Sequence, residues 1–537
     1  MSAAVAPVVV EAESAARDVR GSLAERIGAF APFLAAALTF AIAASIIALY
    51  PVGIFHDDGV YLILAKALAN GDGYRYLNIP GAPVATHYPP LYPLLLALLW
   101  KVAPFPENIT IILLANAILL AVTAWGLTRF VSRTLDWTPS AGAALALVGT
   151  LSLPLLTLAT VALSEVCFLA LLLPALALCE RALITPRSRA HDIAMGMLAG
   201  SLALVRTHGV VLAGALAVVL VYRREWRRAL LVIAGSAVLL VPWQLWIALN
   251  GSVLPKPLRG SYGSYLGWFV DGVTHGGWPQ LTGTVLRNIS ECAALIADRF
   301  ALWPRGVWPV IAMVVAVFCL AVGALRLRPR APVTVVFGAA YLAVTLVWPF
   351  ASWRFVWGVW PLLLLFVVAG AETIVRWRPR ARSLALVRFA SAAAVCLLVA
   401  GVVRDEWATF SGRLWVSPVR DATRNIAPAM RWISKNTRPS DVVIADAEPL
   451  VYLLTDRRAI PPVAFTATEY LTPRSRSADA AALAELVRRY PVRYVVTVVP
   501  STAAAARTFA TPSTARGFTI RETDRLGGGA AFEVTRP

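Results

Sequence analysis

Two adjacent carboxylates, Asp57 and Asp58, directly follow a charge-free apolar run that is long enough to cross a bilayer. A carboxylate at such a place can accept the proton of an attacking hydroxyl group or help to bind a cation. The apolar pattern that follows predicts a short helix lying along the membrane, which Gly71 and Gly73 terminate. One aspartate would serve as the N-terminal cap of that helix, but two aspartates preceded by His56 exceed what a cap needs.

Other ionisable residues lie inside apolar segments, where such groups usually mark function. Glu165 lies near the outer end of a predicted span, and an unpaired carboxylate there would cost several kcal/mol. We expect it to have a partner or a cavity, unless its side chain reaches the interface. Arg206 and His208 interrupt an apolar segment whose halves are too short for ordinary spans, a pattern that often flanks a binding site. The alternative there is a simple outward hairpin.

A lone arginine, Arg354, lies at a predicted outer turn among Trp348, Trp353, Trp357 and Trp360. Tryptophans at that depth usually form an interfacial belt. A guanidinium among them can bind a lipid phosphate through two parallel hydrogen bonds. In the first outer loop, a proline pair holds the chain around His87 in an extended conformation on the same side of the membrane.

The composition is that of a membrane protein, because 58% of the 537 residues are hydrophobic and only 15% are charged. The net charge of +19 comes from arginine clusters between apolar runs, as expected for cytoplasmic loops, and this argues against nucleic-acid binding. The cysteines have no CxxC spacing and predict neither a disulfide framework nor a zinc site. They are Cys167, Cys179, Cys292, Cys319 and Cys396.

We predict an α-helical, multi-pass membrane protein with about eleven spans, because a spanning helix needs about 20 apolar residues and cytoplasmic loops collect Lys and Arg. In this topology residues 1–29 lie in the cytoplasm and residues 30–403 form the membrane domain. The first loop of that domain, residues 53–107, lies outside. The predicted spans are residues 30–52, 108–128, 138–156, 160–180, 192–205, 209–222, 229–249, 306–325, 332–352, 355–372 and 387–403.

Residues 404–537 differ in character, because the strand-like runs DVVIAD and VRYVVTVV alternate with the helical segment AALAELVRRY. They predict a small α/β domain outside the membrane. We expect it to serve as a lid or scaffold, since no acid/base cluster stands out within it.

An outer cavity lined by these acidic and basic groups suits one chemistry. A sugar on a lipid phosphate can dock its phosphate on the cations, while a carboxylate takes the proton of an acceptor hydroxyl that attacks the anomeric carbon. The phosphate is a good leaving group, so a general acid is hardly needed. The chain also lacks a GxxxxGK[ST] phosphate loop, which agrees with the absence of ATP outside. The candidate acidic residues are Asp57, Asp58 and Glu165, and the candidate phosphate-binding residues are Arg354, Arg206 and His87.

These motifs, in order, resemble the GT-C glycosyltransferase superfamily, in particular the protein O-mannosyltransferases and the lipid A aminoarabinose transferases. The resemblance rests on HDDGVYLILAKALANGDGY, HYPPLYPLLLALLW, the Ser164–Glu165 pair, LVRTHG, PWQLWIALNG, WRFVWGVWPLLLL and the tail segment WISKNTRPSDVVIADAEPLVYLLTDRRAIPP. It implies a GT-C fold in a bacterial-type inner membrane. The implied activity is transfer of a sugar from polyprenyl phosphate to a lipid, glycan or protein on the outer face, with inversion.

The resemblance implies that Asp57 is the catalytic base, Asp58 its neighbour and Glu165 a second acidic group. His87 stands where the aminoarabinose transferases often have Lys, and Val60 stands where they have a basic residue. These departures leave mannose, aminoarabinose, arabinofuranose and glucose open as donor sugars. Possible supporting residues are His56, Tyr61 and His208.

Two questions stay open at this point. One is whether the site binds a divalent cation, Mg²⁺ or Mn²⁺. Suitable ligands are offered by His56, Asp57, Asp58 and Glu165. Oligosaccharyltransferases of the superfamily use such an ion, whereas the mannosyltransferase-like branch generally does not. The other is whether the chain is instead a transporter or lipid-linked sugar flippase, because such proteins also keep charges in short interrupted spans. The missing inverted repeat and the large outer domain argue against it.

Overall fold

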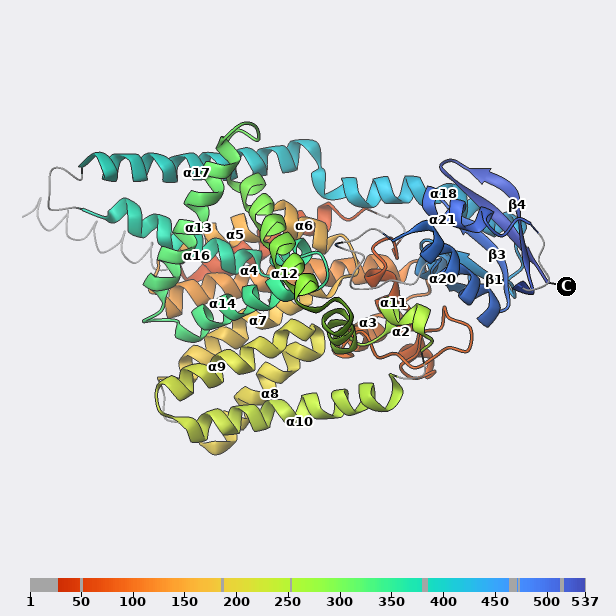
Figure 1. Cartoon of the computed structure of the whole chain (residues 1–537). Coiled ribbons are helices and arrows are strands. Elements are labelled where there is room, and N and C mark those ends of the chain that lie inside the picture. Colours follow the sequence, from red (N-terminus) through yellow and green to blue (C-terminus); the bar gives the residue numbers. More distant parts are fainter. Residues whose placement is uncertain are drawn as a thin grey trace, which may run out of the picture.

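The computed structural model describes residues 28–48, 52–184, 188–251, 254–378, 385–462, 471, 474–511 and 516–536 (Figure 1). About three quarters of the described residues are helical (72%), and a bundle of helices is followed by a smaller unit that contains a sheet. Most of the predicted N-terminal cytoplasmic segment 1–29 lies outside the described residues.

The helical bundle contains the predicted short helix, which begins at Asp57 and ends where Gly71 takes a φ of 84°. Its elements, after a first helix Gly28–Ser45, are α2 (Asp57–Asn70), α3 (Leu91–Trp100), α4 (Asn108–Thr134), α5 (Pro139–Thr150), α6 (Leu153–Ala159), α7 (Ser164–Ala182), α8 (Arg189–Val205), η1 (Thr207–Gly209), α9 (Val210–Tyr222), α10 (Trp226–Asn250), η2 (Lys256–Leu258), α11 (Arg259–Tyr262), α12 (Tyr265–Phe300), α13 (Trp308–Leu327), α14 (Pro332–Val347), α15 (Trp353–Trp357), α16 (Trp360–Arg376) and α17 (Ala385–Gly412).

Five described helices are long and apolar enough to cross a membrane, namely Gly28–Ser45, α4, α10, α13 and α17. The pair α5 and α6, bent by 64°, would make a sixth. The chain is therefore a multi-pass membrane protein. Helices lie at every predicted span position, but α8 and α16 have 17 residues, α14 has 16 and α9 has 13. The count of about eleven spans remains a prediction.

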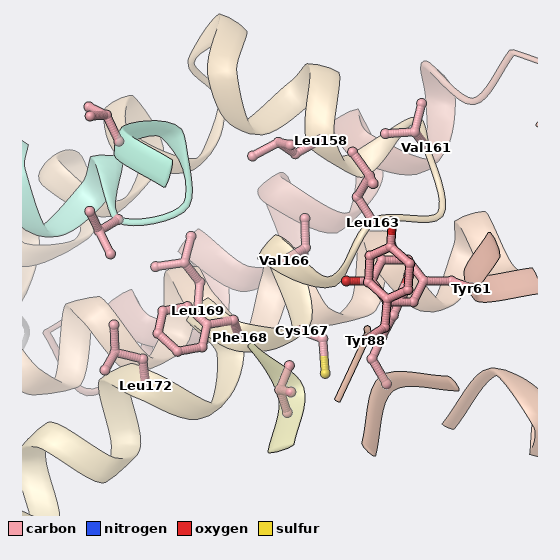
Figure 2. Packing of buried hydrophobic residues seen from close by; sticks show 14 of the residues in the cluster. Tyr61, Tyr88, Leu158, Val161, Leu163, Val166, Cys167, Phe168, Leu169 and Leu172 are labelled. Atoms are coloured by element: carbon pink, nitrogen blue, oxygen red, sulfur yellow. The ribbon is translucent and has the colours of Figure 1, made fainter. Parts of the chain in front are cut away.

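Helix α7 lies in the core of the bundle, which explains why a carboxylate at its start is fully enclosed (Figure 2). Its first turns are apolar on nearly all sides, as is typical of a helix surrounded by others. Phe168 and Leu172 are completely buried, and Cys167 is buried beside them, on the side of α7 where Figure 2 shows Tyr61 and Tyr88.

The C-terminal unit contains a five-stranded sheet of order β2-β1-β3-β5-β4, with β1 parallel to β2 and β3, and β5 antiparallel to β3 and β4. Both predicted strands and the predicted helix exist here. The elements are η4 (Leu414–Val416), α18 (Ser417–Asn436), β1 (Val442–Ala445), α19 (Glu448–Thr455), β2 (Ala459–Ile460), α20 (Arg476–Arg489), β3 (Val492–Thr497), α21 (Pro500–Arg507), β4 (Thr519–Leu526) and β5 (Gly529–Thr535).

The C-terminal unit lies at one end of the molecule, beside α2 and α11 (Figure 1). Helix α17 continues without a break past Val403 to Gly412, so the boundary predicted at residue 404 falls within a helix. Helix α19 of the C-terminal unit contacts α2, so this unit packs against the segment that carries the two aspartates.

Candidate active site

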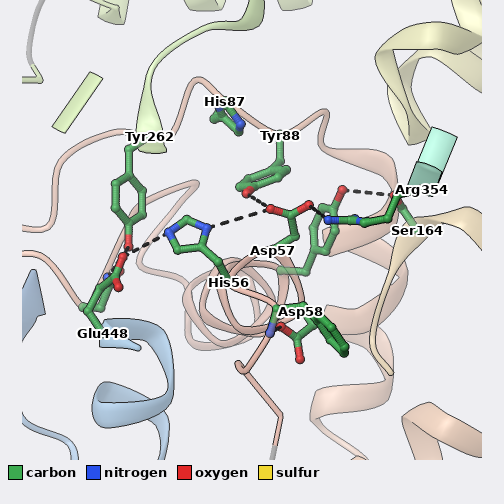
Figure 3. A network of polar contacts seen from close by, with 12 residues as sticks. His56, Asp57, Asp58, His87, Tyr88, Ser164, Tyr262, Arg354 and Glu448 are labelled. Atoms are coloured by element: carbon green, nitrogen blue, oxygen red, sulfur yellow. Dashed lines mark hydrogen bonds and ion pairs between the residues drawn. The ribbon is translucent and has the colours of Figure 1, made fainter. Parts of the chain in front are cut away.

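At the start of α2 the side chains of the two adjacent aspartates point in different directions. Asp58 is buried, and its carboxylate accepts hydrogen bonds from the backbone N–H groups of Gly53 (2.7 Å) and Phe55 (3.0 Å). In Figure 3 it points away from the other polar groups. The sequence placed Asp58 in the site beside Asp57, but the structure instead uses it to hold the turn before α2.

The turn before α2 forces His56 into an unusual conformation, with a φ of 62° and a ψ of −64°. Side chains with a Cβ rarely adopt positive φ, and such strain costs on the order of 1–3 kcal/mol. Strain of this kind persists only where the surroundings determine the conformation. Here it places the imidazole over the first turn of α2, with Nδ1 3.8 Å from a carboxylate oxygen of Asp57.

Asp57 receives two short hydrogen bonds in addition to the nearby imidazole (Figure 3). The hydroxyl of Tyr88 donates to its Oδ1 at 2.6 Å, and Nη1 of Arg354 donates to its Oδ2 at 2.7 Å. Burial alone would raise the pKa of Asp57, but the Arg354 guanidinium, His56 and Tyr88 outweigh it and hold that pKa well below its usual range. Asp57 is therefore an anion at neutral pH.

Glu165 has the partners that its position in a buried helix requires. Nε and Nη2 of Arg354 donate to its Oε1 at 3.2 and 2.9 Å, and Nη1 of Arg206 lies 2.8 Å from the same oxygen. Its second oxygen has no hydrogen-bond partner within the described chain. Charges of opposite sign thus alternate along Asp57, Arg354, Glu165 and Arg206.

The interrupted segment between α8 and α9 brings Arg206 inward, as its two short halves predicted. Arg206 and His208 are both buried, and Arg206 leaves the helix in an extended conformation. At Gly209 a Cβ would lie 2.4 Å from the carbonyl oxygen of Leu202, so only glycine lets the turn fold back onto α8. The hairpin alternative with an exposed arginine is excluded by this burial.

Helix α12 fixes the loop that leads to Arg354. The amide of Asn288 donates to three carbonyls at the end of α14, including that of Trp348 at 2.8 Å. The carboxylate of Glu291 accepts from the backbone N–H and the hydroxyl of Ser352 at 2.8 and 3.0 Å. The sequence did not single out Asn288 or Glu291, since nothing local links them to a loop some 60 residues later.

A cavity of about 560 Å³ opens onto this network, and aromatic rings form much of its wall. Its lining residues are Phe55, His56, Asp57, Tyr61, His87, Tyr88, Pro89, Arg206, Thr207, His208, Gly260, Ser261, Tyr265, Trp348, Phe350, Ala351, Trp353, Arg354 and Phe355. A largely apolar wall with a few convergent polar groups is typical of a small-molecule site. Of the predicted site residues, Asp58 and Glu165 are not among those that line it.

Two histidines face the cavity in different ways. Nδ1 of His87 donates to the carbonyl of Gly263, and burial lowers the pKa of His87 to about 4. The ring is therefore neutral at pH 7, and its Nε2 can only accept a hydrogen bond. The ring of His208 packs against Trp348 and Phe355, with centroids 4.4 and 4.5 Å away, and its Nε2 has no partner in the described part of the chain.

The carboxylates considered for a metal ion do not converge. The guanidinium of Arg354 lies between Asp57 and Glu165, and Asp58 faces the backbone. Across residues 28–536, apart from the short segments left undescribed, no three His, Cys, Asp or Glu side chains form a group suited to a metal ion. The residues present therefore do not fit a metal site of the kind considered.

One buried acid reaches the site from the C-terminal unit and was missed in the sequence. Oε1 of Glu448 lies 3.0 Å from Nε2 of His56 and accepts the hydroxyl of Tyr262 at 2.8 Å (Figure 3). A signal was available, because Glu448 begins α19 in the short connection after strand β1, where polar residues often carry function. Its partner, however, lies 392 residues earlier.

Three solved structures that share the fold have low sequence identity to this chain. ArnT from Cupriavidus metallidurans bound to undecaprenyl phosphate matches with a TM-score of 0.53 and 14% identity, over 94% of this chain and 97% of that chain. The same enzyme in the apo state gives 0.51 with the same identity and coverage. An oligosaccharyltransferase from Archaeoglobus fulgidus in complex with Zn and sulfate gives 0.50 and 12% identity, over 92% of this chain and 73% of that chain.

No protein-family model matches the sequence, and no curated protein is significantly similar to it. The relationship therefore rests on the fold. Both matched enzymes are GT-C glycosyltransferases, and the chain has the GT-C fold that its motifs predicted.

Proposed function

Starting from the GT-C fold, we propose that this chain is a glycosyltransferase that moves a sugar from a polyprenyl phosphate to a hydroxyl acceptor on the outer side of the membrane. The structure of ArnT with undecaprenyl phosphate supports a donor of this class. The observation that carries the proposal is the contact between Asp57 and Arg354, 2.7 Å apart on the wall of one cavity of about 560 Å³. A base and a phosphate-binding group are thus side by side.

Arg354 links donor binding to the base. In the free protein its guanidinium is shared by Asp57 and Glu165, so an incoming phosphate competes with Asp57 for Nη1. A planar guanidinium matches two phosphate oxygens, and Arg206 supplies a second positive charge nearby. Once the phosphate draws Arg354 away, the carboxylate of Asp57 loses its main stabilising cation and becomes a stronger base.

The transfer is then a single displacement. Asp57 takes the proton of the acceptor hydroxyl, and the hydroxyl oxygen forms a bond to the anomeric carbon. The bond between that carbon and the phosphate oxygen breaks, and polyprenyl phosphate leaves with its charge held by Arg354 and Arg206. Tyr88 holds the carboxylate in position through its 2.6 Å hydrogen bond. A single displacement inverts the configuration at the anomeric carbon.

His87 has a different role from the one expected of a phosphate-binding cation. A neutral ring whose Nδ1 is bound to Gly263 offers only a lone pair, which phosphate oxygens repel. It suits a hydroxyl group of the sugar or of the acceptor. Tyr265 beside it, and Trp348 next to Tyr265, can pack against an apolar face of the sugar ring.

The proposed topology places residues 1–29 in the cytoplasm of a bacterial-type cell and the C-terminal unit outside its inner membrane. This orientation follows from the arginine clusters and puts the cavity on the side where polyprenyl-phosphate sugars are used. A reporter enzyme fused after Pro537 that works only when exported tests it. Activity of a cytoplasm-specific reporter at that position would overturn the orientation.

The activity is tested with purified protein and a set of radiolabelled polyprenyl-phosphate sugars. Transfer to an acceptor extract, or slow hydrolysis of the donor without one, supports the enzyme, and Asp57→Asn should abolish both. Movement of the intact donor across vesicles without bond cleavage would instead support a transporter. The anomeric configuration of the product tests the single displacement.

A further inference from the structure

Glu448 is a buried carboxylate that belongs to the C-terminal unit but lies against the active-site loop. It is 1% exposed, so its carboxylate oxygens need hydrogen bonds from protein groups rather than from water. Those partners are the imidazole of His56 at 3.0 Å and the hydroxyl of Tyr262 at 2.8 Å. Tyr262 is held in turn by the amide of Asn78 at 2.8 Å.

Two glycines make this approach possible. A Cβ on Gly59 of α2 would lie 2.6 Å from the Cβ of Pro449, and a Cβ on Gly53 would lie 3.1 Å from the backbone nitrogen of Leu450. Both distances are shorter than side chains normally tolerate. The start of α19 therefore touches the backbone at the start of α2, and Glu448 is carried to His56 by that contact.

The groups around His56 explain what Glu448 does there. The ring faces Asp57 on α2, Glu448 on α19 and the edge of Tyr262 on α11, and His87 is the nearby second histidine. Burial alone would lower the pKa of His56, but the two carboxylates outweigh it and raise that pKa to about 10. His56 is therefore a cation whose Nε2–H is used by Glu448 and whose Nδ1 faces Asp57.

We propose that Glu448 is a positioning residue, which fixes the imidazole of His56 beside Asp57 and so makes docking of the C-terminal unit part of the active site. This role rests on the function proposed above. When the donor phosphate draws Arg354 away, His56 is the cation that remains 3.8 Å from Asp57. It keeps the carboxylate anionic and oriented until the acceptor hydroxyl arrives.

The same interface offers a matched control. Asp456, at the other end of α19, pairs with Lys66 of α2 at 2.9 Å, but its side chain is largely exposed and lies outside the cavity lining. Its backbone is left-handed, with a φ of 54°, which asparagine tolerates well. Asp456→Asn therefore removes one ion pair between the two units without touching His56.

The first measurement needs no sugar transfer. The chain has five histidines, so NMR of protein labelled at the histidine rings can be assigned by replacing them one at a time. Glu448→Gln should lower the titration midpoint of His56 by at least about one pH unit, and Asp456→Asn should leave it unchanged. An unchanged midpoint in Glu448→Gln, or an equal fall in both variants, would overturn the proposal.

The second measurement is transfer itself. Glu448→Gln should lower kcat about tenfold or more, with the donor KM nearly constant, and Glu448→Asp should recover part of the loss. The losses in Glu448→Gln and His56→Gln should not add in the double variant, because both break one contact. Fully additive losses would contradict a shared role. Tyr262→Phe tests the contact separately, since it removes the other donor to Glu448 and keeps the ring.

These two readouts separate the inference from the proposed function. If no sugar is transferred by the natural protein but the His56 midpoint falls only in Glu448→Gln, the positioning contact stands and the glycosyltransferase proposal fails. If sugar is transferred but the His56 midpoint does not move in Glu448→Gln, the glycosyltransferase proposal stands and the positioning role of Glu448 fails.

Discussion

Arg354 donates to Asp57 at 2.7 Å, and the same guanidinium reaches Glu165 at 2.9 Å. One cation thus joins a carboxylate at the start of α2 to a carboxylate from the core helix α7. Because Asp57 is partly open to the cavity and Glu165 is fully buried, a competing anion can displace Arg354 from Asp57 more easily than from Glu165. An anion that enters the cavity should therefore break the contact of Arg354 with Asp57 and leave its contact with Glu165.

Asp57→Asn should lower kcat by at least about 100-fold, because the amide keeps the size of the carboxylate but cannot accept the hydroxyl proton. The affinity for the donor should rise, because the phosphate no longer competes with a carboxylate for Arg354. Transfer assays and donor titration of the two proteins measure both effects. A variant that binds the donor more weakly than the natural protein would contradict the competition.

Arg354→Ala should weaken donor binding roughly 10- to 100-fold, since hydrogen bonds between charged groups are worth about 1.5–3 kcal/mol. It should also slow transfer, because negative charge builds on the leaving phosphate. Arg354→Lys should recover only part of each, because an ammonium keeps the charge but not the planar fork.

A matched control for this arginine is Arg299, which pairs with Asp405 at 2.8 Å away from the cavity. Arg299→Ala should lower thermal stability and leave donor affinity unchanged. If Arg354→Ala behaves in the same way, Arg354 has no role in phosphate binding, and Arg206 becomes the main candidate.

Much of the site could be predicted from the sequence because its residues break a strong local pattern. Glu165, Arg206 and Arg354 stand out against apolar surroundings, and the membrane makes each of them costly unless it is paired. The need of Glu165 for a partner followed from that cost, whereas its pairing with Arg354 and Arg206 was not predicted. Gly71 predicted the end of α2 correctly, since its left-handed conformation is a local requirement of helix termination.

The parts that could not be predicted depend on contacts between distant segments. Asp58 looks like a twin of Asp57, and only the fold of the turn at Gly53 shows that it faces backbone amides. Glu448 looks like an ordinary acid at the start of a helix, where a carboxylate is favourable in any case. The orientation of His87 depends on the carbonyl of Gly263, which no local pattern indicates.

Asp58→Asn should mainly destabilise the protein, by about 1–3 kcal/mol, because the new amide group would face a backbone N–H with another donor. Its kcat per folded molecule should fall far less than that of Asp57→Asn. Chemical unfolding in detergent and transfer assays on the folded fraction measure the two effects. Full stability together with a collapse of kcat would return Asp58 to the chemistry.

The last prediction concerns His56 and the pH dependence of stability. The pKa of His56 is about 10 in the folded protein, against an ordinary value of about 6.5 in the unfolded chain, because the carboxylates of Glu448 and Asp57 outweigh the effect of burial. The folded state binds this proton more tightly, so its stabilising contribution is complete below about pH 6.5 and is lost as the pH rises toward 10. Between these values the Tm of the natural protein should fall with pH more steeply than that of His56→Gln. His275→Gln, the same change at an exposed histidine of α12, should keep the natural slope. Equal slopes in the natural protein and His56→Gln would show that this ion pair does not stabilise the fold.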